Sequence, residues 1–87
     1  MRNIYRTILK HFFRTRLITL RNSTNYTHAE LSEKLQMDER SFSYLIHGKT
    51  SYSAVTLVLF LLYLCPDPNE FLLSLKEEFE KAKNNAA

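Results

Sequence analysis

The amino-acid sequence predicts an all-α domain built from five helices. Apolar residues recur at the three- and four-residue spacing of a helix along nearly the whole chain. Helix start signals, in which a short polar side chain precedes an acidic first turn, recur between these apolar stretches. One glycine and two prolines leave little room for hairpin turns. The 87 residues suffice for a single small domain, residues 1–87, without an internal repeat.

The first helix is expected to be long, from about Ile4 to Asn22, with a break near Phe13 as an alternative. Its apolar positions step by four beside a basic ridge that also steps by four: Arg2, Arg6, Lys10 and Arg14. A polar cluster, residues 22–25, ends the helix. Asn25 suits a helix-ending turn because asparagine tolerates the left-handed conformation.

Two short helices are expected next, separated by a turn of about three residues. Thr27 and Glu30 form a capping box, which predicts a helix from His28 to about Leu35. Asp38 is the next N-cap, for a helix over about 39–47. The apolar positions of the pair are Leu31, Leu35, Phe42 and Leu45. Each helix alone is too short to be stable in water, so the two must pack on each other and on their neighbours.

The second short helix should present a polar, hydrogen-bonding surface to solvent. Its outward positions hold no large aliphatic side chain: Glu39, Arg40, Ser43, Tyr44 and His47. Gly48 is the only glycine of the chain. It stands where a left-handed residue is needed after a helix end.

The fourth helix should begin after the N-cap Ser53 and stop at Cys65 and Pro66. Its stretch AVTLVLFLLYLC contains Thr56 as its one polar side chain. Such a helix is buried all round. It is either the central helix of the domain or packs one side against a second copy of the chain. The residues expected at this homodimer interface are Val55, Leu59, Leu62 and Tyr63.

The fifth helix has a clear start at Asp67 and Pro68, with Glu70 at the third position. One apolar face is expected along it: Phe71, Leu72, Leu75 and Phe79. The apolar run of the fourth helix is shorter than the roughly 20 residues of a membrane span, so no membrane association is expected.

The net charge of +3 is unevenly distributed. Residues 1–26 hold six basic side chains and no acid, whereas residues 67–87 hold three basic and five acidic ones. A basic end suggests a polyanionic partner, and the alternative is an ordinary solvated surface.

Catalytic and metal-binding chemistry is not expected. Cys65 is the only cysteine, so no intramolecular disulfide can form, and its place beside a proline predicts a buried, inert thiol. The three histidines, His11, His28 and His47, lack metal-ligand spacing. No glycine-rich phosphate loop, cofactor motif or small-molecule site is evident. No signal peptide is expected, because the first residues lack an apolar run of the required length, and together with the single cysteine this favours a cytoplasmic protein.

The order and spacing of several motifs resemble the DNA-binding domains of phage repressors and Cro-like regulators, the xenobiotic-response-element type. The motifs are Leu17-x-x-Leu20-Arg21, Thr27-His28-Ala29-Glu30-Leu31, and Phe42-Ser43-Tyr44-Leu45 followed by His47-Gly48-Lys49. Ser53-x-x-Thr56-Leu57 and Leu64 resemble the family's fourth helix. The match covers about Leu17 to Leu72, within a family-like core of about 13–75.

This resemblance implies a five-helix lambda-repressor-like domain with a helix-turn-helix and an extended first helix. It implies a DNA-binding transcriptional regulator, acting as a repressor and a homodimer, whose second short helix enters the major groove. Base contacts are then expected from Arg40, Glu39, Ser43, Tyr44 and His47. Phosphate contacts are expected from His28, Lys49, Thr50, Ser51 and Arg21.

The sequence departs from the family in the two short helices and in the turn between them. The family usually has glycine at Gln36, alanine at Ser32 and glutamine at His28. A left-handed Gln36 would cost on the order of 1 kcal/mol. Glu39 repels phosphates unless it accepts a hydrogen bond from a cytosine. Since members of this family also serve as protein-binding modules, the alternative function is a protein-interaction module without DNA binding.

Overall fold

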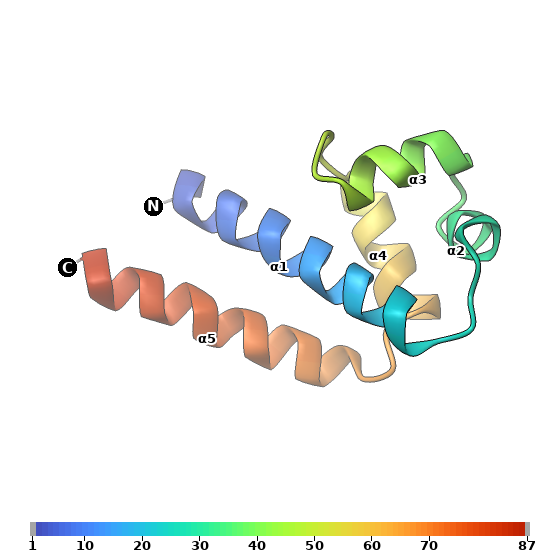
Figure 1. Ribbon diagram of the computed structural model, residues 1–87. Helices are drawn as coiled ribbons and strands as arrows, with labels where there is room; N and C mark the ends of the chain where they lie inside the picture. Colours follow the sequence, from blue (N-terminus) through green and yellow to red (C-terminus); the bar gives the residue numbers. More distant parts are fainter. Residues whose placement is uncertain (1, 87) are drawn as a thin grey trace.

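The computed structural model describes residues 2–86 and contains five α-helices (Figure 1). They are α1 (Arg2–Ser23), α2 (His28–Lys34), α3 (Glu39–Ile46), α4 (Ala54–Tyr63) and α5 (Pro68–Ala86). Residues 2–86 form no strand. The all-α class and the order of the five helices therefore agree with the sequence prediction.

The helices form a lobe and a projecting two-helix arm, which makes the molecule elongated, 43 × 25 × 21 Å. The helices α2, α3 and α4 gather around the C-terminal half of α1 (Figure 1). The N-terminal half of α1 and the C-terminal half of α5 run side by side out of the lobe, and both chain ends lie at the tip of this arm. Tyr5 and Phe79 stack there, with ring centroids 4.6 Å apart.

Four of the eleven buried apolar residues in the core of the lobe are phenylalanines. Phe13, Phe42 and Phe71 are fully buried. Phe13 contacts Phe60 edge-on, with centroids 5.1 Å apart, and Phe60 lies 5.6 Å from Phe71. These rings join α1, α4 and α5, while Phe42 brings α3 into the same core.

The first helix is continuous through Phe13, so the alternative of a break there is wrong. Phe13 and Leu17 are fully buried and hold the middle of α1 in the core, where a break would separate them. The helix ends with Thr24 donating its hydroxyl hydrogen bond to the carbonyl of Leu20, 2.8 Å away. Asn25 does not adopt the left-handed conformation, because this hydroxyl supplies the terminating bond instead.

Helices α2 and α3 both end in a Schellman motif. After α2, Gln36 donates to the carbonyl of Glu33 and Met37 donates to that of Ser32, each at 3.0 Å. Gln36 has φ 55°, the only positive φ among non-glycine residues of 2–86. After α3, Gly48 takes the same role with φ 73°. The left-handed residue predicted at 48 is confirmed, and Gln36 adopts the left-handed conformation that the family resemblance implied at its position.

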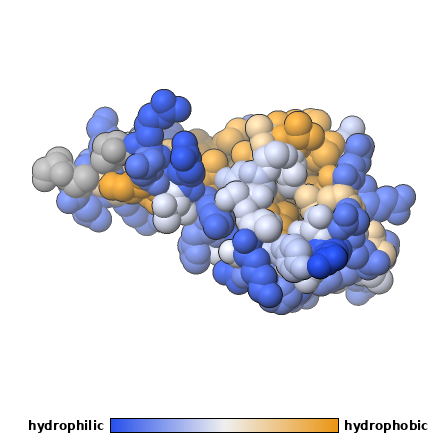
Figure 2. All heavy atoms as spheres, turned by 90° about the horizontal axis from the view of Figure 1, so that it is seen from above, coloured by the Kyte–Doolittle hydropathy of each residue, from blue (hydrophilic) through white to orange (hydrophobic). Residues whose placement is uncertain are grey.

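The fourth helix is not buried all round within one chain, which corrects the sequence expectation of a central helix. Thr56 and Phe60 face the core, but Val55 is 67% and Leu62 is 66% exposed. The physical reason is the small size of the domain, because its other four helices are too few and too short to surround α4. Figure 2 shows apolar atoms gathered along one edge of the lobe.

The residues expected at a dimer interface divide between surface and core. Val55, Leu62 and Tyr63 are exposed. Leu59, by contrast, is only partly exposed and packs against the core cluster. Val58, which the sequence prediction omitted, is 51% exposed and lies on the open side.

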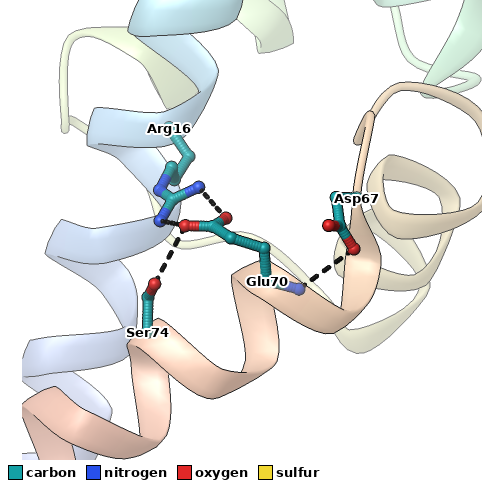
Figure 3. Close-up of polar contacts among 4 residues, drawn as sticks. All are labelled: Arg16, Asp67, Glu70 and Ser74. Carbon is teal, nitrogen blue, oxygen red and sulfur yellow. Dashed lines mark hydrogen bonds and ion pairs between the residues drawn. The ribbon is translucent and has the colours of Figure 1, made fainter.

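An ion pair ties α1 to the start of α5 (Figure 3). The guanidinium of Arg16 donates to both carboxylate oxygens of Glu70, at 2.6 and 2.8 Å. The hydroxyl of Ser74 donates to the same carboxylate at 2.9 Å, and Asp67 caps α5 by accepting from the amide of Glu70 at 3.1 Å. The bonds from Arg16 and from Ser74, that of Arg16 first, hold the pKa of Glu70 at about 2.

None of the helices within residues 2–86 combines the length and the apolar character needed to cross a bilayer.

Candidate nucleic-acid interface

Helix α3 packs one side against the core and leaves the opposite side open to solvent. Phe42, Leu45 and Ile46 are buried on its inner side. The outward positions chosen from the sequence include the exposed Glu39, Arg40 and His47 and the half-buried Ser43 and Tyr44. Ile46 is a core contact that the sequence analysis missed, although its spacing of four from Phe42 was the available signal.

The N-terminus of α3 is fixed by its cap. The carboxylate of Asp38 accepts a hydrogen bond from the amide of Ser41 at 2.7 Å. The bonds from the backbone and side chain of Ser41 lower the pKa of Asp38. The helix therefore starts at a defined residue, and Glu39 and Arg40 follow in its first turn.

Three of the outward side chains form one cluster. The Nε of Arg40 donates to the hydroxyl of Tyr44 at 3.0 Å, and the guanidinium carbon lies 5.7 Å from the ring centroid. The Nζ of Lys49 lies 5.8 Å from the same centroid. The terminal nitrogens of Arg40 make no hydrogen bond within residues 2–86 and can still donate two parallel bonds to an acceptor. The cluster brings two positive charges together beside an aromatic ring.

His47 ends α3 with its imidazole turned back onto the helix. Its Nδ1 lies 2.7 Å from the carbonyl of Ser43. A carbonyl only accepts, so Nδ1 carries the proton in this contact and Nε2 is left to bind outward. This bond orients the His47 ring on the outward face.

His28 and Arg21, both predicted to contact phosphate, lie against each other. One terminal nitrogen of Arg21 is 3.2 Å from the Nε2 of His28. Because a guanidinium only donates, this bond requires Nε2 to act as the acceptor. The His28 ring also packs edge-on against Phe42, with centroids 5.1 Å apart. Both residues are half-buried, and the pair links the end of α1 to α2.

The loop after α3 carries Lys49, Thr50 and Ser51, and all three side chains are exposed. Lys49 is the last residue of the second Schellman motif, its amide donating to the carbonyl of Tyr44 at 2.9 Å. The structure therefore brings this loop and the outward face of α3 together. His28 and Arg21 lie beside the same helices α2 and α3, on the side of α2.

Arg14 supports the end of α3, a role that the sequence did not reveal. Its Nε donates to the carbonyl of Ile46 at 2.6 Å. The Schellman motif occupies the carbonyls of Tyr44 and Leu45 and leaves that of Ile46 without a backbone partner. A Cβ at Gly48 would lie 3.3 Å from the same Nε. The absence of a side chain at residue 48 thus also gives Arg14 room.

Within residues 2–86 no group of three histidine, cysteine or acidic side chains could hold a metal ion. Cys65 is half-buried rather than fully buried, and burial raises the pKa of its thiol.

Comparisons with protein-family models, with curated proteins and with solved structures found no match to this chain.

Proposed function

We propose that this chain is a helix-turn-helix regulator that binds specific sites in duplex DNA, with a lambda-repressor-like arrangement of its five helices. In this proposal α3 enters the major groove, whose base edges distinguish all four base pairs. The observation that carries the proposal is the outward face of α3. It is polar, lies on a helix capped at both ends, and continues into the exposed loop at Lys49.

The roles of the side chains follow from their chemistry. Arg40 reads a guanine through its free terminal nitrogens, while Tyr44 holds the guanidinium in place through its hydroxyl. Ser43 and His47 contact base edges or nearby phosphates. Lys49, Thr50 and Ser51 bind the phosphate backbone, as does the pair of His28 and Arg21. Glu39 accepts a hydrogen bond from a cytosine amino group.

The protein is further proposed to act as a homodimer through the open side of α4. Val55, Leu62 and Tyr63 are each more than 60% exposed, and α4 itself contains no charged residue, although Tyr63 borders Glu30, Glu33 and Lys34 of α2. A continuous apolar surface of this kind marks an interaction site. A dimer with two α3 helices would bind two half-sites one helical turn apart.

The second candidate is a protein-interaction module that does not bind DNA. One specific observation favours it: four of the seven exposed large apolar side chains, Val55, Val58, Leu62 and Tyr63, lie on α4. A partner held by apolar contacts would respond weakly to salt, whereas DNA binding weakens steeply. Salt dependence therefore separates the two functions.

The test selects bound sequences from a random duplex library and then measures affinity against salt by fluorescence anisotropy. Arg40→Ala should cost about 1–3 kcal/mol on the selected site and relax preference at one base pair. Lys49→Ala should weaken selected and random duplexes alike, lowering the salt slope by about 0.9. Lys83→Ala, at the exposed end of α5, is the matched control and should change neither.

Glu39→Gln tests which role Glu39 has on the outward face of α3. If Glu39 accepts from a cytosine, its loss weakens the selected site alone. If it only repels phosphate, its loss tightens binding to random duplexes. Unchanged binding in Arg40→Ala, Lys49→Ala and Glu39→Gln, with all three folded by circular dichroism, would leave the interaction module as the function.

A further inference from the structure

The basic side chains in the first part of the chain fall into two groups in the structure. Three of them have internal partners: Arg14 with the carbonyl of Ile46, Arg16 with Glu70, and Arg21 with His28. The other three, Arg2, Arg6 and Lys10, form no hydrogen bond or ion pair within residues 2–86. We call these three the α1 ridge. Arg14 and Arg16 serve the fold, and Arg21 is shared with His28, so the positive charge of α1 that has no internal partner is concentrated in the ridge.

The α1 ridge has a regular geometry because its residues are four apart on one helix. Each step advances about 6 Å along the axis and about 40° around it, so Arg2 and Lys10 lie about 12 Å apart along α1. Phosphates of one DNA strand follow each other every 3.4 Å or so of duplex axis. A row of cations about 6 Å apart that lies along the duplex therefore advances by the rise of roughly two phosphates per step, and can reach the backbone over a few base pairs.

The ridge continues into the loop proposed to contact phosphate. Arg6 and Lys10 line an open depression of about 610 Å³ together with Ser51 and Tyr52 from that loop. Ser51 lies two residues after Lys49. The α1 ridge and the loop therefore border a single hollow, and together they extend the basic surface from the end of α3 onto the arm.

The acidic residues lie elsewhere. Helix α5, which carries most of the acids of the C-terminal part, runs on the side of α1 opposite to α3 (Figure 1). Glu78 lines a separate depression, with His11 and Thr15 of α1. The ridge thus presents positive charge toward the α3 side of the arm.

We propose that the α1 ridge binds the phosphate backbone of the duplex that flanks the base pairs contacted by α3. This inference rests on the proposed DNA-binding function and adds a second contact region to it. The arm would lengthen the footprint by about 3–4 base pairs, which is 12 Å divided by 3.4 Å per base pair. These contacts carry no sequence information and increase affinity for any flanking sequence.

The experiment compares two duplexes, the minimal selected site and the same site extended by about one helical turn (10 base pairs) on each side. The test protein carries Arg6→Gln and Lys10→Gln. The control carries Lys76→Gln and Lys83→Gln, which remove the same charge from exposed positions of α5. Affinity is measured by fluorescence anisotropy over a range of salt concentrations.

The wild-type protein should bind the long duplex more tightly and with a steeper salt dependence. The ridge variant should lower the salt slope on the long duplex by about 1.8, at 0.9 for each lost phosphate contact. On the minimal site it should match the wild type. The α5 control should match the wild type on both duplexes.

The two proposals fail in distinguishable ways. If the wild type binds the selected site but gains nothing from the flanks, or if the ridge variant weakens both duplexes equally, the ridge assignment is wrong while DNA binding stands. A wild-type protein that binds no duplex overturns both. Loss of binding to phosphatidylserine vesicles in the ridge variant, with DNA binding intact, would assign the ridge to a membrane surface and overturn the inference.

Discussion

Replacing Arg14 tests whether the end of α3 depends on a side chain from α1. In Arg14→Met the apolar part of the side chain is retained, while the donor to the carbonyl of Ile46 is lost. The carbonyl of Ile46 then has no protein donor, because the Schellman bonds at this helix end go to the carbonyls of Tyr44 and Leu45. The variant should unfold more easily than the wild type.

The size of the effect follows from two contributions. A hydrogen bond from a charged donor contributes about 1.5–3 kcal/mol, and half-burial of Arg14 places it in the lower half of that range. A positive charge at a helix C-terminus contributes about 0.3–1 kcal/mol more. The free energy of unfolding should therefore fall by about 2 kcal/mol. In a domain of this length each kcal/mol lowers Tm by about 4–8 °C.

Urea unfolding followed by circular dichroism measures the loss, and the same helix supplies the control. Arg6→Met removes a ridge residue without an internal partner, so its effect should stay within about 0.5 kcal/mol. Hydrogen exchange adds a local measurement, because the amides of Gly48 and Lys49 should lose protection in Arg14→Met alone. Equal stability of the two variants would refute the assigned role of Arg14.

Three further predictions concern the turn, the ion pair and the dimer. Gln36→Gly should raise the free energy of unfolding by about 0.5–1 kcal/mol in urea titrations, because relief of the left-handed strain exceeds the added entropy of the unfolded chain. A lower free energy of unfolding would contradict the strain assigned to Gln36. Because the pKa of Glu70 in the folded state lies below its ordinary 4.5, its contribution is complete above that pH and is lost as the pH falls toward about 2. Glu70→Gln should therefore flatten the fall of Tm over this range, and an unchanged profile would refute the link. Leu62→Arg should convert the proposed dimer into a 10.3 kDa monomer in sedimentation, with Ile4→Arg on the arm as the neutral control; a wild type that already sediments as a monomer would remove the dimer.

Much of the fold could be predicted because its signals are local. Capping residues such as Thr27, Asp38 and Ser53 satisfy amides within a few positions of themselves, so a reader of the sequence can place each helix start. The same holds for Gly48 and Gln36, whose left-handed backbone serves a turn of only a few residues. The predicted bounds of α1 to α4 lie within about two residues of the observed ones, and α1 begins at Arg2 instead of Ile4.

The side chains that support the fold and the end of α3 were less predictable, because their partners lie far apart in the sequence. Arg14 and the carbonyl of Ile46 are 32 residues apart, and Arg16 and Glu70 are 54 residues apart. Nothing in the spacing of the basic residues separates those used inside the fold from those left for a partner. The exposed side of α4 was predicted in part: Val55, Leu62 and Tyr63 are exposed as expected, but Leu59 was wrongly included and Val58 was missed, since a run of apolar residues has no periodicity that marks which side faces the core.

The position of the two chain ends at the tip of the arm has a practical consequence for tethering (Figure 1). A fluorescent tag, a surface anchor or a second binding module joined to either end would leave from the point most remote from α2 and α3. A short linker between the two ends would also give a cyclic chain that could be reopened in the exposed loop 49–51. Immobilised or fused versions of this protein should therefore keep the α3 surface open, whichever end carries the attachment.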